Sequence, residues 1–211
     1  MRITKFVHSC LLIETATKTV LIDPGKYSWD SHLLTIGKIE RLDYIVITHE
    51  HSDHYHLPFL QALINHFPHS TIVTNSDLAK KISSEEVRNK IISGSEAGMQ
   101  VFEADHEPLP MGIRVPLNMG VHIDEQFTHP GDAVHLSHTR NILALPVSAP
   151  WISLKQSLEA VLVLKPSKVI PIHDWHWHKQ AREEQYALAE QWLLPHGIKF
   201  VALQNAVPVE L

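Results

Sequence analysis

The chain has 211 residues, of which 44% are hydrophobic and 19% charged, and its formal net charge is −5. This composition is typical of a folded globular protein and excludes a disordered chain, and the length suits a single domain over residues 1–211. A net negative charge does not attract the phosphate backbone of a nucleic acid, so we expect no nucleic-acid partner.

The sequence also bears on where the protein works. Cys10 is the single cysteine, so an intramolecular disulfide is excluded, which fits a reducing compartment. The apolar run near the N-terminus is short and is interrupted by His8 and Ser9, which is typical of a strand pair and not of a signal peptide. No stretch approaches the roughly 18 uncharged apolar residues of a membrane span. We therefore expect a soluble, cytoplasmic protein that acts on a small molecule without a membrane, and the sequence leaves a homo-oligomer open.

The first half of the chain combines short β-rich runs with one clear amphipathic helix. The expected elements are strands at 3–7, 11–14, 19–22, 44–48 and 71–74, a helix at 58–67, and short helices within the polar stretch 76–97. The turn Asp23-Pro24-Gly25 ends the third strand. The β-branched run 44–48 predicts a strand that is buried on both faces and leads directly into His49.

The second half repeats this plan. The expected elements are strands at 101–103, 113–117, 121–127, 142–147, 169–172 and 198–203, a helix after a capping box of Ser153 and Gln156, and a helix at 179–193 with Ala181, Leu188, Ala189, Trp192 and Leu193 on one stripe. The strand at 169–172 leads directly into His173, just as the earlier strand leads into His49. Two mixed sheets packed face to face, with helices outside, would bring such strand ends together.

The strongest chemical signal lies between His49 and His54, in a chain with 17 histidines. The side chains of residues two apart in an extended stretch point the same way, so His49 and His51 can coordinate one ion. Asp53 and His54 follow where the chain turns into a helix, and they can face a second ion. Imidazole nitrogen and carboxylate oxygen are ligands that zinc takes. The alternative is a solvated polar loop, but burying these groups without partners would cost several kcal/mol.

At this point the sequence resembles a known superfamily. Residues 48–54 match the His-x-His-x-Asp-His motif of the metallo-β-lactamase fold. Residues 6–14 and 21–25 are similar to the opening hairpins of its small lactonase and phosphodiesterase-like branches. The run 129–132 resembles the Gly-Asp motif, and 171–174 resembles the final histidine motif. These matches stand in family order and span most of the chain.

The resemblance implies an α/β (α+β) fold, a four-layer αββα sandwich of two mixed β-sheets flanked by helices. It also implies a ligand set for two metal ions: His49 and His51 with a third histidine at the first, Asp53, His54 and His173 at the second, and Asp132 bridging both. Motif order favours His106 as the third histidine of the first site. His122 competes, although it stands in a run that resembles the strand before the Gly-Asp motif.

Other residues are candidates for supporting roles near the metals or the substrate. His8 lies in the first hairpin and either approaches the metals or is an ordinary hairpin residue. Trp151 either lines the substrate cleft or belongs to the core, and His176 either lines the cleft or lies in a loop. The identity of the proton donor stays open between His8 and His176. Asp23 and Asp174 are candidates for orienting ligand histidines from behind.

The chemistry implied is hydrolysis by a dinuclear site, with zinc expected and manganese or iron as alternatives. The two ions would share a bridging hydroxide that attacks a small-molecule lactone or other ester. Asp53 would orient the hydroxide, and Asp132 would bridge the ions, so both are expected to be catalytic. A phosphodiesterase is the second reading of the same site, and a non-hydrolytic metal-binding or di-iron redox protein is the third.

Overall fold

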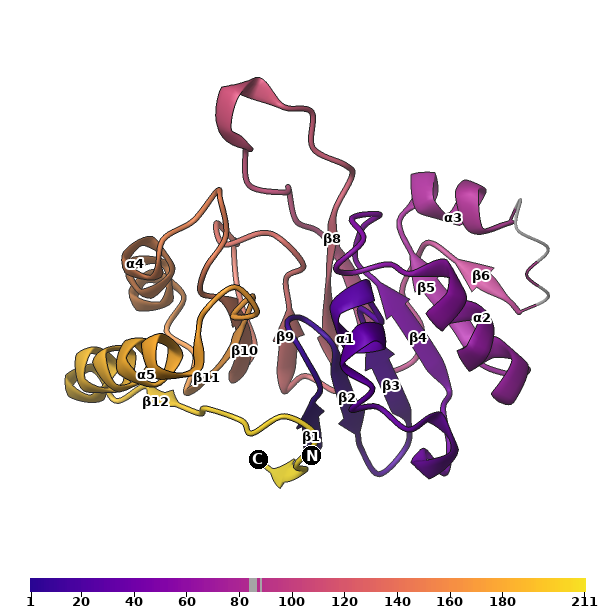
Figure 1. The fold of residues 1–211 in the computed structure, drawn as a ribbon, viewed down its shortest axis with the longest axis horizontal. Helices are drawn as coiled ribbons and strands as arrows, with labels where there is room; N and C mark the ends of the chain where they lie inside the picture. Colours follow the sequence, from indigo (N-terminus) through magenta and orange to yellow (C-terminus); the bar gives the residue numbers. More distant parts are fainter. Residues whose placement is uncertain (84–86, 88) are drawn as a thin grey trace. The chain divides into compact units, whose positions relative to one another are not determined.

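The computed structural model of the protein describes residues 1–83, 87 and 89–211. The chain forms two compact units (Figure 1). Unit 1 comprises residues 1–94 and 203–211, and unit 2 comprises residues 95–202. The expectation of a single domain stays a prediction.

Unit 1 is built on a mixed sheet, to which the described residues contribute seven strands in the order β13-β1-β2-β3-β4-β5-β6. The strands are β1 (Arg2–Lys5), β2 (Leu11–Glu14), β3 (Thr19–Ile22), β4 (Tyr44–Ile47), β5 (Thr71–Thr74), β6 (Ile91–Ile92) and β13 (Val209–Glu210). Pairing is antiparallel from β13 to β3 and parallel from β3 to β6. The parallel strands β3 and β4 therefore end at one edge, where Asp23 and His49 follow.

Helices cover one face of this sheet. They are α1 (Lys26–Ser31), α2 (Leu57–His66) and α3 (Ser76–Ser83), with a 3₁₀ turn η1 (Ile36–Lys38). Pro58 stands in the first turn of α2, where its missing N–H costs nothing, and Phe59, Leu60 and Leu63 are buried against the sheet. Ile45 and Ile47 of β4 join this core, whereas Val46 alternates to the other face and is also buried.

Unit 2 is built on a second mixed sheet, with strand order β12-β11-β10-β9-β8-β7 among the described residues. The strands are β7 (Met99–Glu103), β8 (Met119–Ile123), β9 (Phe127–His129), β10 (Ile142–Pro146), β11 (Lys168–Ile172) and β12 (Lys199–Phe200). Pairing is antiparallel from β7 to β9 and parallel from β9 to β12. The expected class, α/β with two mixed sheets flanked by helices, is confirmed.

The helices of unit 2 cover β10 to β12. They are α4 (Leu154–Leu164) and α5 (Lys179–Leu193), with 3₁₀ turns η2 (Pro110–Gly112) and η3 (Leu194–His196). The predicted capping box at the start of α4 is confirmed: Gln156 N–H donates to Ser153 Oγ, and Ser153 N–H donates to the Gln156 side chain. In α5, Ala189 and Leu193 are buried, but Leu188 and Trp192 are exposed, so the predicted stripe was too wide. No helix in the described ranges is long and apolar enough to cross a membrane.

The predicted strand at 113–117 is wrong. This stretch belongs to a loop between β7 and β8 that projects beyond the end of β8 in Figure 1, and we call residues 108–117 the apolar arm. Met111 and Gly112 both have positive φ angles, 58° and 67°, and Pro110 and Pro116 cannot donate backbone hydrogen bonds, so the arm cannot extend a sheet. Met111, Ile113 and Leu117 are left exposed, and Met111 is 94% exposed.

Smaller differences concern segments with weak patterns. The final strand expected at 198–203 is reduced to β12, and neither α1 nor β13 was foreseen. Of the short helices expected within 76–97, α3 is present, whereas residues 84–86 and 88 of that stretch lie outside the described residues.

Two valines on α4 offer a matched test of the unit 2 core. Val161 is fully buried, whereas Val163 is 79% exposed on the same helix. We expect Val161→Ala to lower the free energy of unfolding by about 2 kcal/mol, because it removes buried methyl groups and leaves a cavity. Val163→Ala should change it by less than about 0.5 kcal/mol. Urea unfolding measures both, and equal losses would contradict this packing.

Candidate metal centre

In unit 1, the segment after β4 gathers nitrogen and oxygen donors into two groups. His49 Nε2 lies 3.0 Å from His51 Nδ1. Asp53 Oδ2 lies 3.0 Å from His8 Nε2 and 3.8 Å from His54 Nε2. Within each group, the potential ligand atoms lie within 4.8 Å of one another. His49 thus lies beside His51, and Asp53 lies beside His54, while His8, left open by the sequence, lies directly against Asp53.

A buried carboxylate fixes the direction of these histidines. Asp23 is fully buried; its Oδ1 accepts a hydrogen bond from Thr48 N–H (2.8 Å), and its Oδ2 accepts from Thr48 Oγ1 (2.9 Å) and His54 Nδ1 (2.7 Å). Thr48 Oγ1 accepts in turn from His49 Nδ1 (3.1 Å). With Nδ1 protonated and engaged, Nε2 of His54 and of His49 carries the lone pair that a metal ion needs. The donor set therefore fits a metal ion of the type the family motif implies.

The turn that carries Asp23 also packs tightly against the motif. A Cβ atom at Gly25 would lie only 1.7 Å from the carbonyl oxygen of Asp53. Lys26 N–H donates to the carbonyl of Ser52 at 2.7 Å, which joins the two segments by a backbone hydrogen bond. Only glycine allows this approach, so the predicted turn at 23–25 also positions the metal motif.

In unit 2, three strand ends bring His106, Asp132 and His173 together. His106 follows β7, Asp132 follows β9 and His173 follows β11. Asp132 Oδ2 lies 3.3 Å from His106 Nε2, and its Oδ1 lies 2.7 Å from His173 Nε2. All three are buried, and His106 Nδ1 donates to the backbone carbonyl of Glu107 at 2.6 Å. Each oxygen of Asp132 thus faces a different histidine.

The structure separates the two candidates for the third histidine. His106 lies beside Asp132, whereas His122 is on β8 with its Nδ1 2.9 Å from Thr128 Oγ1 and its Nε2 3.0 Å from His138 Nε2. Val121 and Ile123 are buried in the core, so strand alternation turns His122 to the opposite face of the sheet. The distances within unit 2 therefore favour His106, as motif order did.

The loop that carries Asp132 is held by two polar side chains. Asn118 Oδ1 accepts from Asp132 N–H at 3.2 Å, and its Nδ2 donates to the carbonyls of Ala104 and Pro130. Glu107 Oε1 accepts from the N–H groups of residues 134 and 135. Gly131 has a φ of 62°, and a Cβ there would lie 2.1 Å from Asn118 Oδ1. The Gly-Asp motif thus needs glycine both for its backbone conformation and for space.

The remaining predicted residues differ in their surroundings. The Trp151 ring stands edge-on to His106 and His173, with centroid distances of 5.8 and 5.4 Å. Asp174 Oδ2 accepts from Tyr186 Oη at 2.6 Å, which ties the loop after β11 to α5. His176 is exposed. Trp151 therefore borders the donors, whereas the hydrogen bond of Asp174 serves to anchor a helix.

Three of the candidate site residues adopt a left-handed backbone. The φ angles are 61° at His8, 49° at Asp23 and 63° at His173. Such values are uncommon for residues other than glycine, and they gather at functional sites where the surrounding structure enforces them. Nothing in the sequence pattern announced them.

Several contributors to the site were not found from the sequence. Thr48, Asn118 and Glu107 act through the hydrogen bonds described above, and only Thr48, within the motif match, carried a signal. Tyr27 stands edge-on to His8 with the ring centroids 5.2 Å apart, and burial and Asp53 raise the pKa of its phenol. Cys10 is fully buried, and burial raises the pKa of its thiol to about 12, so it lacks the lowered pKa of a catalytic thiol.

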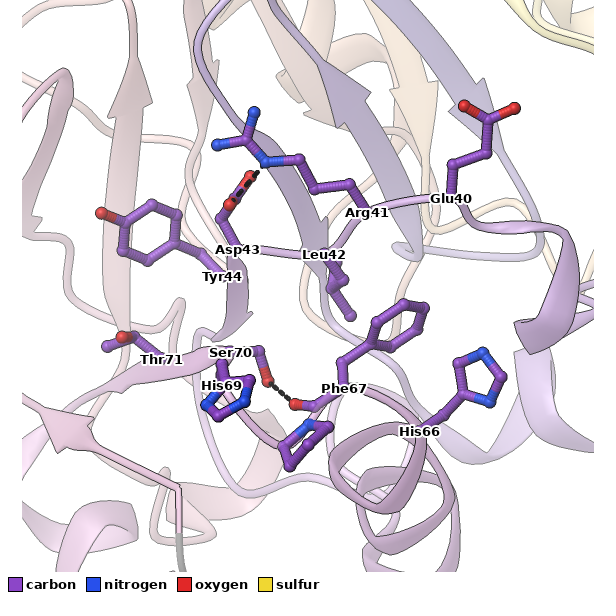
Figure 2. A pocket seen from close by; sticks show the side chains of 11 residues that line it. Glu40, Arg41, Leu42, Asp43, Tyr44, His66, Phe67, His69, Ser70 and Thr71 are labelled. Carbon is purple, nitrogen blue, oxygen red and sulfur yellow. Dashed lines mark hydrogen bonds and ion pairs between the residues drawn. The ribbon is translucent and has the colours of Figure 1, made fainter.

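A pocket of about 490 Å³ lies in unit 1 at the amino-terminal ends of β4 and β5, opposite the strand ends that carry the metal-binding motif (Figure 2). Its lining residues, 40–44 and 66–71, precede or begin β4 and β5, whereas the metal-binding motif follows β4. Arg41 Nε donates to Asp43 Oδ1 at 2.7 Å on its wall. Since ligands of open α/β sheets bind at the carboxyl ends of the strands, we do not assign the active site to this pocket.

Residues 2–173 match the family described as the beta-lactamase superfamily domain. The chain belongs to this superfamily. A protein of Mycobacterium tuberculosis named Rv0786c is 27% identical over 184 residues, which cover 82% of this chain and 84% of that protein. A UPF0173 metal-dependent hydrolase of Caldivirga maquilingensis is 26% identical over 207 residues, covering 90% and 89% of the two chains.

Among solved structures, the superfamily fold is matched by Igni18, described as a novel metallo hydrolase from Ignicoccus hospitalis. The TM-score is 0.71, with 17% identity and coverage of 100% of this chain and 98% of that one. At this identity the match shows a shared fold. The expected family, the metallo-β-lactamase superfamily, is confirmed, and with it the expected enzyme class, a metal-dependent hydrolase.

Two glycines with positive φ test the Asp132 loop. Gly131 and Gly197 have φ angles of 62° and 71°, but only a Cβ at Gly131 meets another atom. Each substitution by alanine should cost about 1 kcal/mol for the left-handed backbone. Gly131→Ala should cost more and also lower the metal content, since it displaces Asn118 from Asp132. Thermal unfolding and metal analysis measure this, and equal behaviour of the two variants would refute the close approach.

A second variant tests the histidine orientation by Asp23. We expect Asp23→Asn to weaken metal binding by about 10–100-fold, because the amide is a poorer acceptor for His54 Nδ1–H and Thr48. Asp30→Asn is the control, since Asp30 is half exposed and its carboxylate pairs with Lys26 at 2.6 Å. Competition with a chromogenic chelator gives both affinities, and unchanged binding in Asp23→Asn would remove the orienting role.

Proposed function

We propose that the protein is a hydrolase that holds two zinc ions, with manganese or iron as alternatives, and cleaves a small-molecule lactone or other ester. The proposed ligands are His49, His51 and His106 for the first ion, Asp53, His54 and His173 for the second, and Asp132 as the bridge. The assignment follows motif order in the superfamily and the donor geometry inside each unit. The observation that carries it is the network around Asp23, which leaves Nε2 of His49 and His54 as donors.

Two divalent ions in such a site supply Lewis acidity and a hydroxide nucleophile close to neutral pH. The protein residues have separate tasks around them. Asp53 orients the attacking water, and His8, whose Nε2 lies 3.0 Å from Asp53 Oδ2, holds that carboxylate in place. Asp132 supplies one oxygen toward each of its two histidines. His8 is also our first choice for the proton donor, because it is buried beside Asp53 whereas His176 is exposed.

The surroundings of the unit 2 donors favour a substrate with an apolar part. The Trp151 ring stands beside His106 and His173, and the apolar arm begins two residues after His106. An apolar wall favours the binding of an uncharged ester, from which water is easily excluded, but it does not stabilise the charge of a phosphodiester. We therefore place lactones and other esters first.

The setting of the enzyme is part of the same proposal. We propose a cytoplasmic protein, because its one cysteine, Cys10, is buried as a free thiol. A small molecule is the partner, and the net charge of −5 disfavours nucleic acid. A homo-oligomer is left open for measurement in solution.

A substrate screen tests the proposed chemistry. Lactones, p-nitrophenyl esters, thioesters and bis-(p-nitrophenyl) phosphate are assayed with and without chelator, beside metal analysis of the purified protein. We expect close to two metal equivalents and chelator-sensitive ester or lactone hydrolysis. Faster cleavage of the phosphodiester would select the phosphodiesterase reading, and full activity without metal would refute the proposal.

Two aspartates test the assignment of the donors. We expect Asp53→Ala and Asp132→Ala each to lower kcat/KM at least about a hundredfold while the protein stays folded, since each positions a reacting group or an ion. Asp77→Ala on α3 is the control, because Asp77 is exposed. Circular dichroism establishes folding, and near-normal activity in either site variant would remove that residue from the mechanism.

A further inference from the structure

A pair of histidines in unit 2 lies outside the proposed ligand set. His122 is on β8, and His138 is in the segment between β9 and β10. Their Nε2 atoms are 3.0 Å apart. His122 is buried and His138 is exposed, so solvent reaches the pair from the side of His138.

The other ring nitrogen of each histidine faces a hydroxyl group. Thr128 Oγ1 lies 2.9 Å from His122 Nδ1, and Ser137 Oγ lies 3.0 Å from His138 Nδ1. Thr128 is itself held in place, because its hydroxyl oxygen accepts from Arg140 N–H at 2.8 Å. When Nδ1–H of both rings donates to these oxygens, both Nε2 atoms carry the lone pairs that a bound ion needs, the same arrangement that Asp23 and Thr48 create for His54 and His49.

His122 is held rigidly and in its neutral form. Its ring stacks on Phe102 with centroids 4.3 Å apart and an interplanar angle of 18°. Gly120 makes room for this stack, since a Cβ there would lie 2.1 Å from the Phe102 ring. Burial first, and then Arg140 and His138, lower the pKa of His122 to about 4, so its lone pair is available at neutral pH.

The cation nearest to the pair has its own partners. The Arg140 guanidinium lies 2.8 Å from Glu125 Oε2 and donates to Gln100 Oε1 at 3.0 Å. The Glu125 carboxylate therefore partly neutralises the charge of Arg140. A bound divalent ion would therefore meet a partly balanced charge.

We propose that His122 and His138 form a second transition-metal site, separate from the hydrolytic centre and suited to Cu²⁺ or Ni²⁺. Two nitrogens 3.0 Å apart subtend about 90° at an ion held by bonds of about 2.1 Å, whereas a tetrahedral zinc ion needs a wider separation. Right-angled imidazole ligands suit the tetragonal geometry of copper and nickel, and water completes the shell. Copper also binds most strongly in the order of divalent metals.

The position of the pair gives such an ion a structural effect. His138 belongs to the segment 130–141, which also carries Asp132, and His122 belongs to the neighbouring strand β8. Asn118 and Glu107 hold the beginning of this segment, and the histidine pair lies near its end. An ion at the pair would therefore fasten the second end of the Asp132 segment to the sheet.

Copper titration of the zinc-loaded enzyme tests the site. Wild type, His138→Ala, His122→Gln and the control His69→Ala, which removes an exposed histidine of unit 1, are titrated with Cu²⁺ and followed by electron paramagnetic resonance. A zinc indicator records any exchange at the hydrolytic centre, and that fraction is subtracted. We expect wild type and His69→Ala to bind one more Cu²⁺ than the two pair variants, with imidazole nitrogen couplings in the spectrum.

The affinity provides a second criterion. We expect His138→Ala to weaken this additional copper binding at least about tenfold, because one of its two ligands is lost. Since His138 is exposed, the variant should keep the circular dichroism and thermal unfolding of the wild type. Equal copper uptake by wild type and His138→Ala would overturn the proposal and leave the pair as a histidine–histidine hydrogen bond.

Discussion

The carboxylate of Asp23 is the contact on which the metal-binding motif of unit 1 depends. A fully buried carboxylate is costly unless its oxygens are saturated with hydrogen bonds, and here Thr48 and His54 supply three. The same bonds decide which nitrogen of His54 points outward, and through Thr48 they decide it for His49. The Asp23 carboxylate can be buried only when its oxygens are hydrogen-bonded, and these hydrogen bonds determine the direction of two metal donors. This arrangement holds Asp23 in a left-handed backbone conformation, which costs conformational free energy.

Unit 2 orients its donors in a different way. A backbone carbonyl, that of Glu107, engages His106 Nδ1, and an amide side chain, that of Asn118, holds the backbone of Asp132. The Glu107 carboxylate caps two N–H groups further along the same loop. The donors of unit 2 are therefore oriented by fixing loop backbone, whereas those of unit 1 are oriented by one carboxylate. In both units the donors stand in segments that follow strands, so the sheet fixes where these segments begin.

The parts of the fold that were predicted from the sequence are those with strong local patterns. The β-branched run of β4, the proline at the start of α2 and the capping box of α4 each depend on neighbouring residues, and each was found. The expected strand at 113–117 failed because its apolar residues mimic a buried strand, while the prolines and positive φ angles around them prevent pairing. The exposure of Leu188 could not be predicted from the local sequence pattern either, because it depends on which neighbouring element covers α5.

The candidate site was predictable to the extent that it is a motif. The grouping of His49 with His51 and of Asp53 with His54 follows from chain geometry, but the choice between His106 and His122 needed the faces of β8 and the position of Asp132. Tyr27, Asn118 and Glu107 come from separate parts of the chain and have no spacing to recognise. The strained backbones of His8 and His173 are enforced by packing, so they too are invisible before folding.

The contact between Gly25 and the carbonyl of Asp53 has a consequence for protein engineering. Two segments separated by more than a strand and a helix fit together with no space for a methyl group, so neither is an independent module. Transplanting residues 48–54 alone onto another scaffold would carry the donors without the turn that shapes their backbone. The smallest transferable unit is therefore the pair of segments, 23–26 and 48–54, together with the parallel strands that hold them in register.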